Sequence, residues 1–228
     1  MSLDKDQTRG AVLARRRILT PAQQQATGLA LRAALSQIVC TLPRGAGIAT
    51  YASTGSEPDT ALLLASCADV PVLLPVLRPD GDLDWAMFEG ELVPGGRGTL
   101  EPPGRRLGRD AIADCVLVVV PALGVDRTGI RLGRGGGSYD RALVRARGFV
   151  VAALHPGELQ DHLPAEPHDH PVDGVVLPEQ GLVRLPLPAT GEIERRRASR
   201  TYGPPTRVLP RASTAPGLRA PQHAAWPW

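Results

Sequence analysis

The feature that most constrains the fold is the run at 114–120, which after Asp114 is apolar and mostly β-branched. A strand without polar alternation is typical of a parallel sheet that is buried on both faces. Residues 149–154 repeat the pattern, and a helix is expected to start near Ser138, between the two strands. Strands that alternate with helices predict an open, mostly parallel α/β sheet with helices on both faces, a three-layer α/β/α fold.

Local signals predict the other elements. Thr20, Pro21 and Gln23 supply an N-cap, a first-turn proline and a capping-box partner, so a helix should run over 21–40. Helical spacing of apolar residues indicates an earlier helix over 3–19. Short strands are predicted at 47–51, 71–76 and 174–177, and a further helix at 60–67.

Composition divides the chain of 228 residues into a domain at 1–188 and a tail at 189–228. Between 191 and 228 there are seven Arg, six Pro and no Lys, with no apolar period. The tail is therefore predicted to be a disordered extension. Because basic charge is concentrated there, the formal net charge of +3 does not indicate a nucleic-acid-binding fold.

Cysteine usage and hydropathy predict a cytoplasmic protein. Cys40, Cys67 and Cys115 are odd in number and widely spaced, which fits neither a disulfide framework nor a CxxC metal site. The longest strongly apolar run, 116–125, is too short to cross a membrane. Residues 1–17 alternate acids and bases and lack the apolar stretch of a signal peptide.

Residues 131–140 indicate chemistry most strongly, because they follow the buried strand and open the predicted helix. In open α/β sheets, ligands bind beyond the carboxyl ends of the strands. Closely spaced glycines let an anion approach backbone N–H groups, and Arg131 and Arg134 add forked donors for phosphate. The pattern fits neither GxxxxGK[ST] nor GxGxxG. Since the chain has 25 glycines, a flexible loop without a ligand remains an alternative.

Lysine is almost absent from the chain. Lys5 stands alone among 26 basic residues, the others being arginine. One interpretation is a specific role near the N-terminus, and the other is chance at a frayed end of the chain.

The segment 121–140 resembles the signature of the 5-formyltetrahydrofolate cyclo-ligase family, also called 5,10-methenyltetrahydrofolate synthetases. The resemblance covers about residues 5–180 and leaves the tail outside it. Lys5 and Arg9 have the spacing of the family's ATP-binding pair. The matching signature positions are Pro121, Leu123, Asp126, Gly129, Arg131, Leu132, Gly133, Gly135, Gly137, Tyr139 and Asp140.

This resemblance implies an ATP-dependent ligase acting on 5-formyltetrahydrofolate. ATP phosphorylates the formyl oxygen, N10 of the folate attacks the activated carbon, and phosphate leaves as the methenyl ring closes. The resemblance further implies Mg²⁺ held by Asp140 and Asp173, with catalytic roles for Arg134 and Tyr139. The implied nucleotide-binding residues are Lys5, Arg9, Arg131, Leu132, Gly133, Arg134, Gly135, Gly136, Gly137, Ser138 and Tyr139.

The same resemblance places folate against Glu57, with Tyr51 nearby. Ser138 departs from the family, in which many members carry a tyrosine near the substrate. Asp126 is expected to be a turn carboxylate, and His155 receives no role. The cluster at 85–88 is expected to belong to the core rather than to a pterin pocket.

Other functions stay open from the residues alone. A sugar-phosphate isomerase or an acyl-CoA transferase would share the sheet and the glycine loop without consuming ATP. An RNA-binding protein would use the arginine-rich tail. The ligase interpretation expects a monomer with a folate substrate, polyglutamylated or not, and neither a membrane nor a specific nucleic acid as partner.

Overall fold

The structure is a computed structural model that describes residues 4–67 and 69–187. Within these residues, seven strands form one sheet, in which five inner strands run parallel and an antiparallel strand lies at each edge. The prediction of an open, mostly parallel α/β sheet is confirmed. In spatial order the strands are β12 (Gly181–Arg184), β11 (Gly174–Leu177), β9 (Phe149–Ala153), β6 (Cys115–Pro121), β1 (Gly47–Ala49), β2 (Val72–Leu77) and β3 (Leu83–Met87).

The central strands β6 and β9 are the two that the uninterrupted apolar runs predicted. They pair in parallel, and Leu117 and Val120 of β6 are completely buried. Burial on both faces explains why neither strand alternates with polar residues. Trp85 in β3 is also fully buried, as expected for core, whereas Met87 at the end of that strand is 36% exposed.

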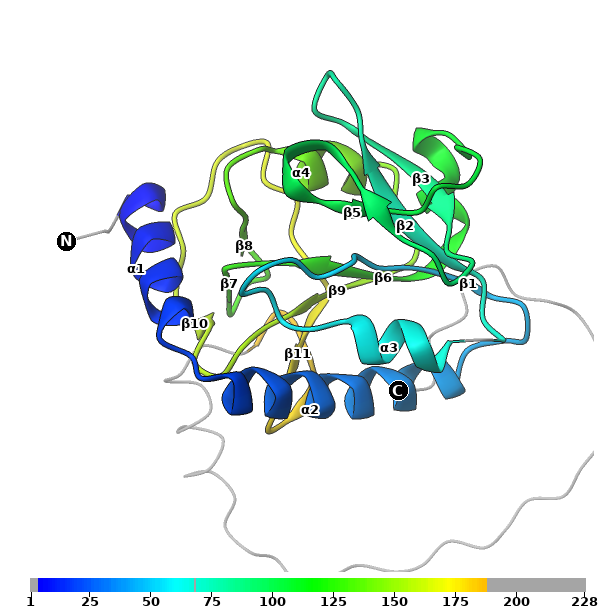
Figure 1. Cartoon of the computed structure of the whole chain (residues 1–228). Coiled ribbons are helices and arrows are strands. Elements are labelled where there is room, and N and C mark those ends of the chain that lie inside the picture. Colours follow the sequence, from blue (N-terminus) through cyan, green and yellow to red (C-terminus); the bar gives the residue numbers. More distant parts are fainter. Residues whose placement is uncertain (1–3, 68, 188–228) are drawn as a thin grey trace, which may run out of the picture. The chain divides into compact units, whose positions relative to one another are not determined.

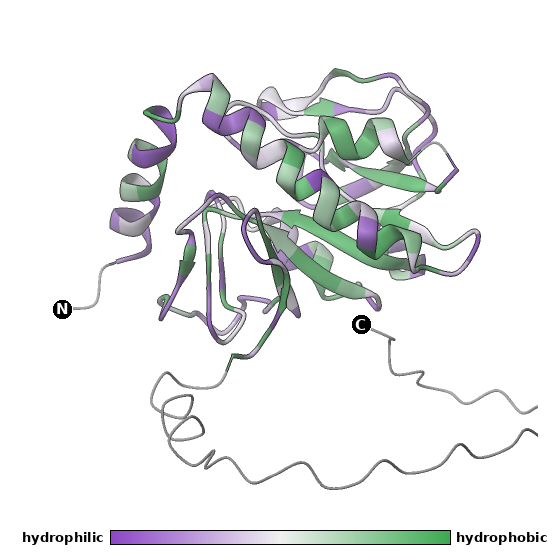
Figure 2. Ribbon diagram, turned by 90° about the horizontal axis from the view of Figure 1, so that it is seen from below, coloured by the Kyte–Doolittle hydropathy of each residue, from purple (hydrophilic) through white to green (hydrophobic). Residues whose placement is uncertain are grey.

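Helices cover both faces of the sheet (Figure 1). The long helix α2 (Pro21–Cys40) and the short α3 (Ala61–Ser66) lie together on one face, and α2 begins with the predicted capping box. On the other face lie α4 (Ser138–Leu143) and the 3₁₀ helix η2 (Arg109–Asp114). Viewed from the α2 side, the strands behind the helices are predominantly hydrophobic (Figure 2).

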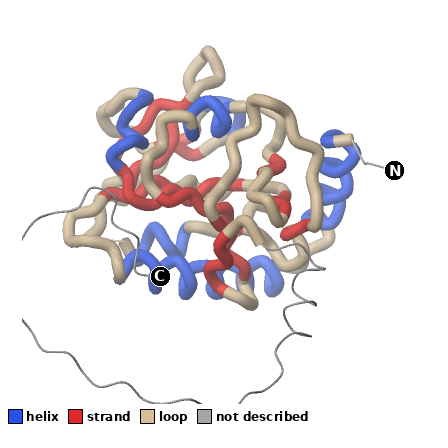
Figure 3. Tube along the Cα trace, turned by 180° about the vertical axis from the view of Figure 1, so that it is seen from behind, coloured by secondary structure: helices blue, strands red, loops and turns tan. Residues whose placement is uncertain are grey.

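Helix α1 (Lys5–Arg17) lies beside a small second sheet. Within the described residues this sheet has the strand order β10 (Leu159–Gln160), β7 (Gly124–Asp126) and β8 (Arg131–Leu132). In Figure 3 these strands are short segments surrounded by loops. Only residues 127–130 join β7 to β8, whereas α4 and β9 lie between β8 and β10. Sequence patterns did not predict them, because strands of two or three residues carry no readable period.

A short hairpin follows β3. It consists of β4 (Val93–Pro94), the turn η1 (Gly96–Gly98) and β5 (Leu100–Glu101). Glu101 Oε1 accepts a hydrogen bond from the N–H of Leu77 at 3.0 Å. This bond fastens the hairpin to the carboxyl end of β2.

No helix among the described residues is both long enough and apolar enough to span a membrane. The predicted tail at 189–228 lies outside the described residues. The three cysteines are free thiols, in agreement with the absence of a disulfide framework.

Candidate active site

A cleft of about 450 Å³ opens beyond the carboxyl ends of β1, β2 and β6. Its walls come from parts of the chain that are far apart in sequence: the start of α1, the loop after β1, the glycine segment (residues 133–137) and the loop at 166–169. This is the position that open α/β sheets give to their ligands. The cleft collects, from the sequence expectations, Lys5, Arg9, Tyr51, Glu57, Arg131, Leu132, Gly133, Arg134, Gly135, Gly136, Gly137, Ser138, Tyr139 and Asp140.

Lys5 points into an acidic corner of this cleft. Its Nζ lies 2.6 Å from Glu166 Oε2 and 2.7 Å from Asp169 Oδ2, and the Lys5 and Asp169 side chains are only 12% and 7% exposed. Burial opposes the charge on both groups, yet their mutual hydrogen bonds prevail, so the pKa of Lys5 is raised and the pKa of Asp169 is lowered. The only lysine of the sequence is therefore held as a cation by two specific ion pairs. These contacts exclude the alternative that Lys5 lies in a frayed N-terminus.

Arg9, one turn further along α1, reaches the glycine segment directly. Its Nε donates to the carbonyl oxygen of Gly133 at 3.0 Å, and its guanidinium also pairs with Asp6. A side-chain carbon added to Gly135 would lie 3.7 Å from Arg9 Cζ. Helix α1 and the glycine segment are thus direct neighbours, although 124 positions separate Arg9 from Gly133.

The glycine segment adopts a backbone that other residues rarely take. Gly135 has φ +95° and Gly137 has φ +66°, both in the region that favours glycine. A side-chain carbon at Gly133 would lie 2.8 Å from Arg131 Nη1. These glycines keep the floor of the cleft open and leave backbone N–H groups accessible to a ligand.

Arg131 and Asp140 form a largely buried ion pair beside the glycine segment. Arg131 Nη2 lies 2.8 Å from Asp140 Oδ1, and the Arg131 guanidinium stacks over the Tyr139 ring at 5.7 Å from its centroid. The Tyr139 hydroxyl is buried and has no hydrogen-bond partner among the described residues. Burial, helped by the Glu57 charge and opposed by Arg131, raises the pKa of Tyr139, so the hydroxyl is a neutral donor that a ligand can use.

The loop after β1 supplies Glu57 and Tyr51. Glu57 Oε2 accepts from the N–H of Thr54 at 2.9 Å, and its Oε1 lies 3.3 Å from Arg134 Nε. The Tyr51 hydroxyl donates to the carbonyl of Pro58 at 2.9 Å. Arg134 therefore bridges the glycine segment to the carboxylate that the sequence assigned to folate.

His155, which received no role from sequence, supports this loop from behind. It is 3% exposed, and its Nε2 lies 3.1 Å from the carbonyl oxygen of Ser56, next to Glu57. Burial lowers the pKa of His155, so the ring is neutral at physiological pH and Nε2 is the donor to that carbonyl. Its role is structural support of the Glu57 loop.

Asp126 is a turn carboxylate, as expected. It is fully buried, and its oxygens accept from the N–H groups of Thr128, Ile130 and Leu163. This carboxylate fixes the turn before the glycine segment, and nothing places it among the cleft residues.

Of the two carboxylates that the resemblance places on the metal side, Asp140 lines the cleft and Asp173 lies outside it. Asp173 does not line the cleft; its Oδ2 accepts from the N–H of Val150 at 2.8 Å, at the start of β9. The carboxylates that reach the cleft from this loop are Glu166 and Asp169.

Some residues that line the cleft are not among those expected from the sequence. No sequence pattern marks Glu166 and Asp169 as partners of Lys5. Arg97 reaches the cleft from η1 with φ +54°. No sequence signal marks Arg97, because only the folded hairpin brings it there.

The fold and this cleft define an α/β enzyme whose site combines arginine and lysine cations, glycine backbone and carboxylates. A sequence model of the 5-formyltetrahydrofolate cyclo-ligase family matches residues 1–178. The chain therefore belongs to the 5-formyltetrahydrofolate cyclo-ligase family.

Curated relatives and solved structures agree with this assignment. The chain is 39% identical over 191 residues to the 5-formyltetrahydrofolate cyclo-ligase of Mycolicibacterium smegmatis, covering 79% of this chain and 97% of that protein. It is 32% identical over 179 residues to the cyclo-ligase of Escherichia coli K12, covering 73% and 96%. The structure of Aquifex aeolicus 5,10-methenyltetrahydrofolate synthetase matches with a TM-score of 0.67 at 25% identity, over 82% of this chain and 95% of that one.

Proposed function

We propose that the protein converts 5-formyltetrahydrofolate to 5,10-methenyltetrahydrofolate at the expense of ATP, in a reaction that requires Mg²⁺ and releases ADP and phosphate. The observation that carries the proposal is the junction of α1 with the glycine segment, where Lys5, Arg9 and Gly133 line one cleft. Membership of the cyclo-ligase family supports the substrate class.

The residue types suit the chemistry. The γ-phosphoryl group moves to the formyl oxygen, N10 attacks the formyl carbon, and the carbon–oxygen bond breaks as phosphate leaves. Phosphoryl transfer depends mainly on positioning and on neutralising charge. Lys5, Arg9 and Arg131 supply positive charge, while the glycine N–H groups are available to phosphate oxygens. Arg134, which faces Glu57, stands between the nucleotide and folate sides of the cleft.

The carboxylates of the cleft fit a hard cation. Mg²⁺ prefers oxygen ligands, keeps several waters, and supplies neutralisation of phosphate charge when it is bound. Asp140 and Asp169 are the residues that would hold it. Both carboxylates are paired with cations of the protein, Asp169 with Lys5 and Asp140 with Arg131, and Mg²⁺ would take the place of these cations on the carboxylate oxygens.

The folate side is less polar. Leu77 and Leu83 line the cleft beside Tyr51, Glu57 and Tyr139. A flat ring system needs apolar walls together with a few directed polar groups. Glu57 offers acceptor oxygens and Tyr139 offers a donor hydroxyl for that purpose.

The function is tested by mixing the purified full-length chain with 5-formyltetrahydrofolate, ATP and Mg²⁺. We expect methenyl-folate absorbance to appear together with one ADP for each product molecule. Product formation without ADP would indicate an ATP-independent reaction of the isomerase or transferase type. Folded protein that forms neither product nor ADP would contradict the proposal.

Substitution of Asp169 and Asp173 separates the two candidates for the metal-side carboxylate. Asp169→Asn is expected to raise the Mg²⁺ concentration for half-maximal activity by about 10-fold or more, because one charged oxygen ligand is lost. Asp173→Asn is the matched control and should leave this concentration unchanged, since Asp173 faces Val150. The opposite result would return the metal role to Asp173.

Removal of the Tyr139 hydroxyl distinguishes a ligand contact from a structural one. Tyr139→Phe should leave the free energy of unfolding within about 0.5 kcal/mol of wild type while lowering kcat/KM about 10-fold, because the hydroxyl has no partner among the described residues. Tyr51→Phe removes the bond to Pro58 and should cost about 1 to 2 kcal/mol of stability. Denaturant unfolding and steady-state kinetics measure both. Unchanged kcat/KM for Tyr139→Phe would remove Tyr139 from the site.

We further propose a cytoplasmic monomer that accepts 5-formyltetrahydrofolate with or without a polyglutamate tail. The free thiols support a reducing compartment. Light scattering of the purified chain and kinetics with mono- and polyglutamylated substrate test the remaining two points.

A further inference from the structure

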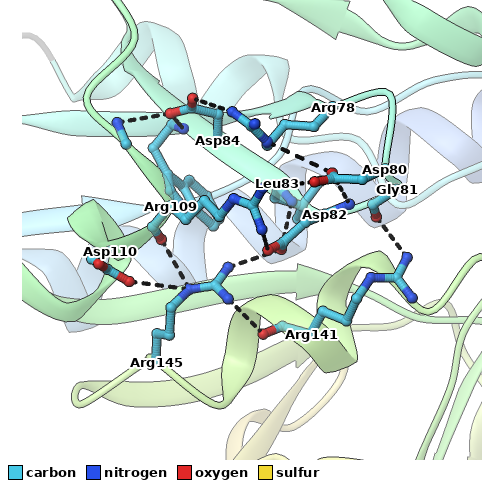
Figure 4. Close-up of polar contacts among 12 residues, drawn as sticks. Arg78, Asp80, Gly81, Asp82, Leu83, Asp84, Arg109, Asp110, Arg141 and Arg145 are labelled. Carbon is cyan, nitrogen blue, oxygen red and sulfur yellow. Dashed lines mark hydrogen bonds and ion pairs between the residues drawn. The ribbon is translucent and has the colours of Figure 1, made fainter.

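Arg141 of α4 connects the glycine segment to a distant turn of the sheet. Its side chain reaches toward the β2–β3 turn (residues 78–82), as Figure 4 shows. Arg141 Nη2 donates to the carbonyl oxygen of Gly81 at 2.6 Å and to that of Gly136 at 2.8 Å. One guanidinium nitrogen thus bonds to two backbone carbonyl groups that are 55 residues apart in the chain.

The packing around this guanidinium is close on both sides. A side-chain carbon at Gly81, which has φ +81°, would lie 2.8 Å from Arg141 Nη2. A side-chain carbon at Gly137, which has φ +66°, would lie 2.9 Å from Arg141 Nη1. Both positions require glycine, because their φ angles are positive and because a side chain would collide with the Arg141 guanidinium.

The turn that receives Arg141 is itself firmly held. Asp82 is 4% exposed and pairs with Arg145 Nη2 at 2.8 Å and with Arg109 Nη1 at 3.2 Å. Arg145 Nη1 also donates to the carbonyl oxygen of Arg141 at 3.1 Å (Figure 4). The turn is therefore a fixed anchor.

The glycine segment needs such an anchor. Helix α4 has six residues, and a helix of that length is not stable without tertiary contacts. Its N-cap is Gly137, which makes no side-chain capping bond. Glycines also lose more backbone entropy on ordering than other residues. Arg9 contacts the segment at Gly133, and Arg141 contacts it at Gly136, next to the start of α4.

We propose that Arg141 is a positioning residue that holds the glycine segment ready for the triphosphate by tying Gly136 to Gly81. Arg141 is not among the residues that line the cleft, so it acts through the Gly136 backbone rather than on phosphate. The consequence for ATP rests on the function proposed above. The ordering of the glycine segment by Arg141 does not rest on that function, because it is a property of the protein without ligand.

The test uses the full-length chain with three changes. Arg141→Lys keeps the positive charge but replaces the planar guanidinium by an ammonium group. An ammonium group cannot reproduce the several directed hydrogen bonds of a guanidinium. Gly81→Ala introduces a side chain against the guanidinium from outside the cleft. Gly90→Ala is the matched control, because Gly90 has φ +96° and nothing within 4 Å of the added carbon.

Amide hydrogen exchange of the unliganded protein is the first readout. Exchange at the backbone N–H of residue 141, which donates to the carbonyl oxygen of Gly137 at 3.1 Å, is expected to become about 10-fold faster in Arg141→Lys and Gly81→Ala, and to stay at the wild-type rate in Gly90→Ala. Unchanged exchange in both of the first two variants would overturn the proposal, and so would equal acceleration in Gly90→Ala.

Steady-state kinetics is the second readout. KM for ATP should rise about 10-fold or more in Arg141→Lys and Gly81→Ala, with a smaller change in KM for folate, because misplaced binding groups cost affinity before chemistry. Faster exchange with an unchanged KM for ATP would overturn the positioning role. If wild type itself shows no cyclo-ligase activity, the proposed function fails, while the exchange data still decide whether Arg141 orders the segment.

Discussion

Lys5→Ala is expected to lower kcat/KM of the cyclo-ligase reaction by about 100- to 1,000-fold, the usual loss when one positioned donor to a developing charge is removed. Lys5 is the only lysine in the chain, and it lies in the cleft with Arg9 and the glycine segment. Its partners Glu166 and Asp169 hold it at the edge where phosphate charge would be neutralised. Steady-state kinetics with varied ATP measures the effect.

Arg15→Ala is the matched control for this substitution. Arg15 is a cation of the same helix, but it donates to the carbonyl of Pro156 outside the cleft, so kcat/KM should stay within about 2-fold of wild type. Equal losses in Lys5→Ala and Arg15→Ala would show that damage to α1, rather than loss of the ammonium, causes the defect. Full activity of Lys5→Ala would remove Lys5 from the mechanism.

The Lys5–Asp169 pair also gives a pH dependence of stability. The pKa of Asp169 is lowered in the folded state, so its contribution is present above the ordinary value of 3.8 and is lost as pH falls below it. The pKa of Lys5 is raised, so its contribution is complete below 10.5 and is lost as pH rises through the folded value. Neither group titrates near neutral pH.

Glu158→Gln is expected to lower the free energy of unfolding by about 3 to 5 kcal/mol, because it leaves a buried arginine without its counter-charge. Glu158 and Arg16 are each 1% exposed at the side chain, with Arg16 Nη2 2.7 Å from Glu158 Oε2. Arg16 Nη2 also donates to the carbonyl of Ala122, and Glu158 accepts from the N–H of His155. The pair therefore joins α1 to the chain just before β7 and β10 of the small sheet.

A loss of this size corresponds to a fall of about 10 °C in Tm for a chain of this length. Glu179→Gln is the control, since Glu179 is an exposed carboxylate of the pocket that Arg16 and Glu158 also line. It should change Tm by less than about 2 °C. Thermal unfolding followed by circular dichroism measures both variants. A Glu158→Gln protein as stable as wild type would mean that the pair contributes nothing to docking of α1.

The sequence predicted the large elements because their signals are long or redundant. Helix α2 has the predicted bounds, since a capping box marks its start and apolar residues continue to its end. Strands β6 and β9 are marked by five or more apolar residues each. The strands β7, β8 and β10 have two or three residues and depend on tertiary pairing, so no local pattern could reveal them.

The parts of the candidate site that could be predicted are those whose residues lie close together in the sequence. The glycine segment and the Lys5–Arg9 spacing are local patterns, and the structure brings both to one cleft. The ion pair of Lys5 with Asp169 joins residues 164 positions apart and leaves no trace in spacing. A linear motif does not say which carboxylates of the 166–173 segment face the cleft, and the structure places Asp169 there and Asp173 outside it.

The most direct test is a crystal structure of the full-length chain with Mg²⁺ and a non-hydrolysable ATP analogue. We expect one triphosphate to contact both Lys5 Nζ and backbone N–H groups of residues 133–137. A triphosphate bound away from α1 would contradict the account. So would a triphosphate that contacts the glycine segment but not Lys5 Nζ.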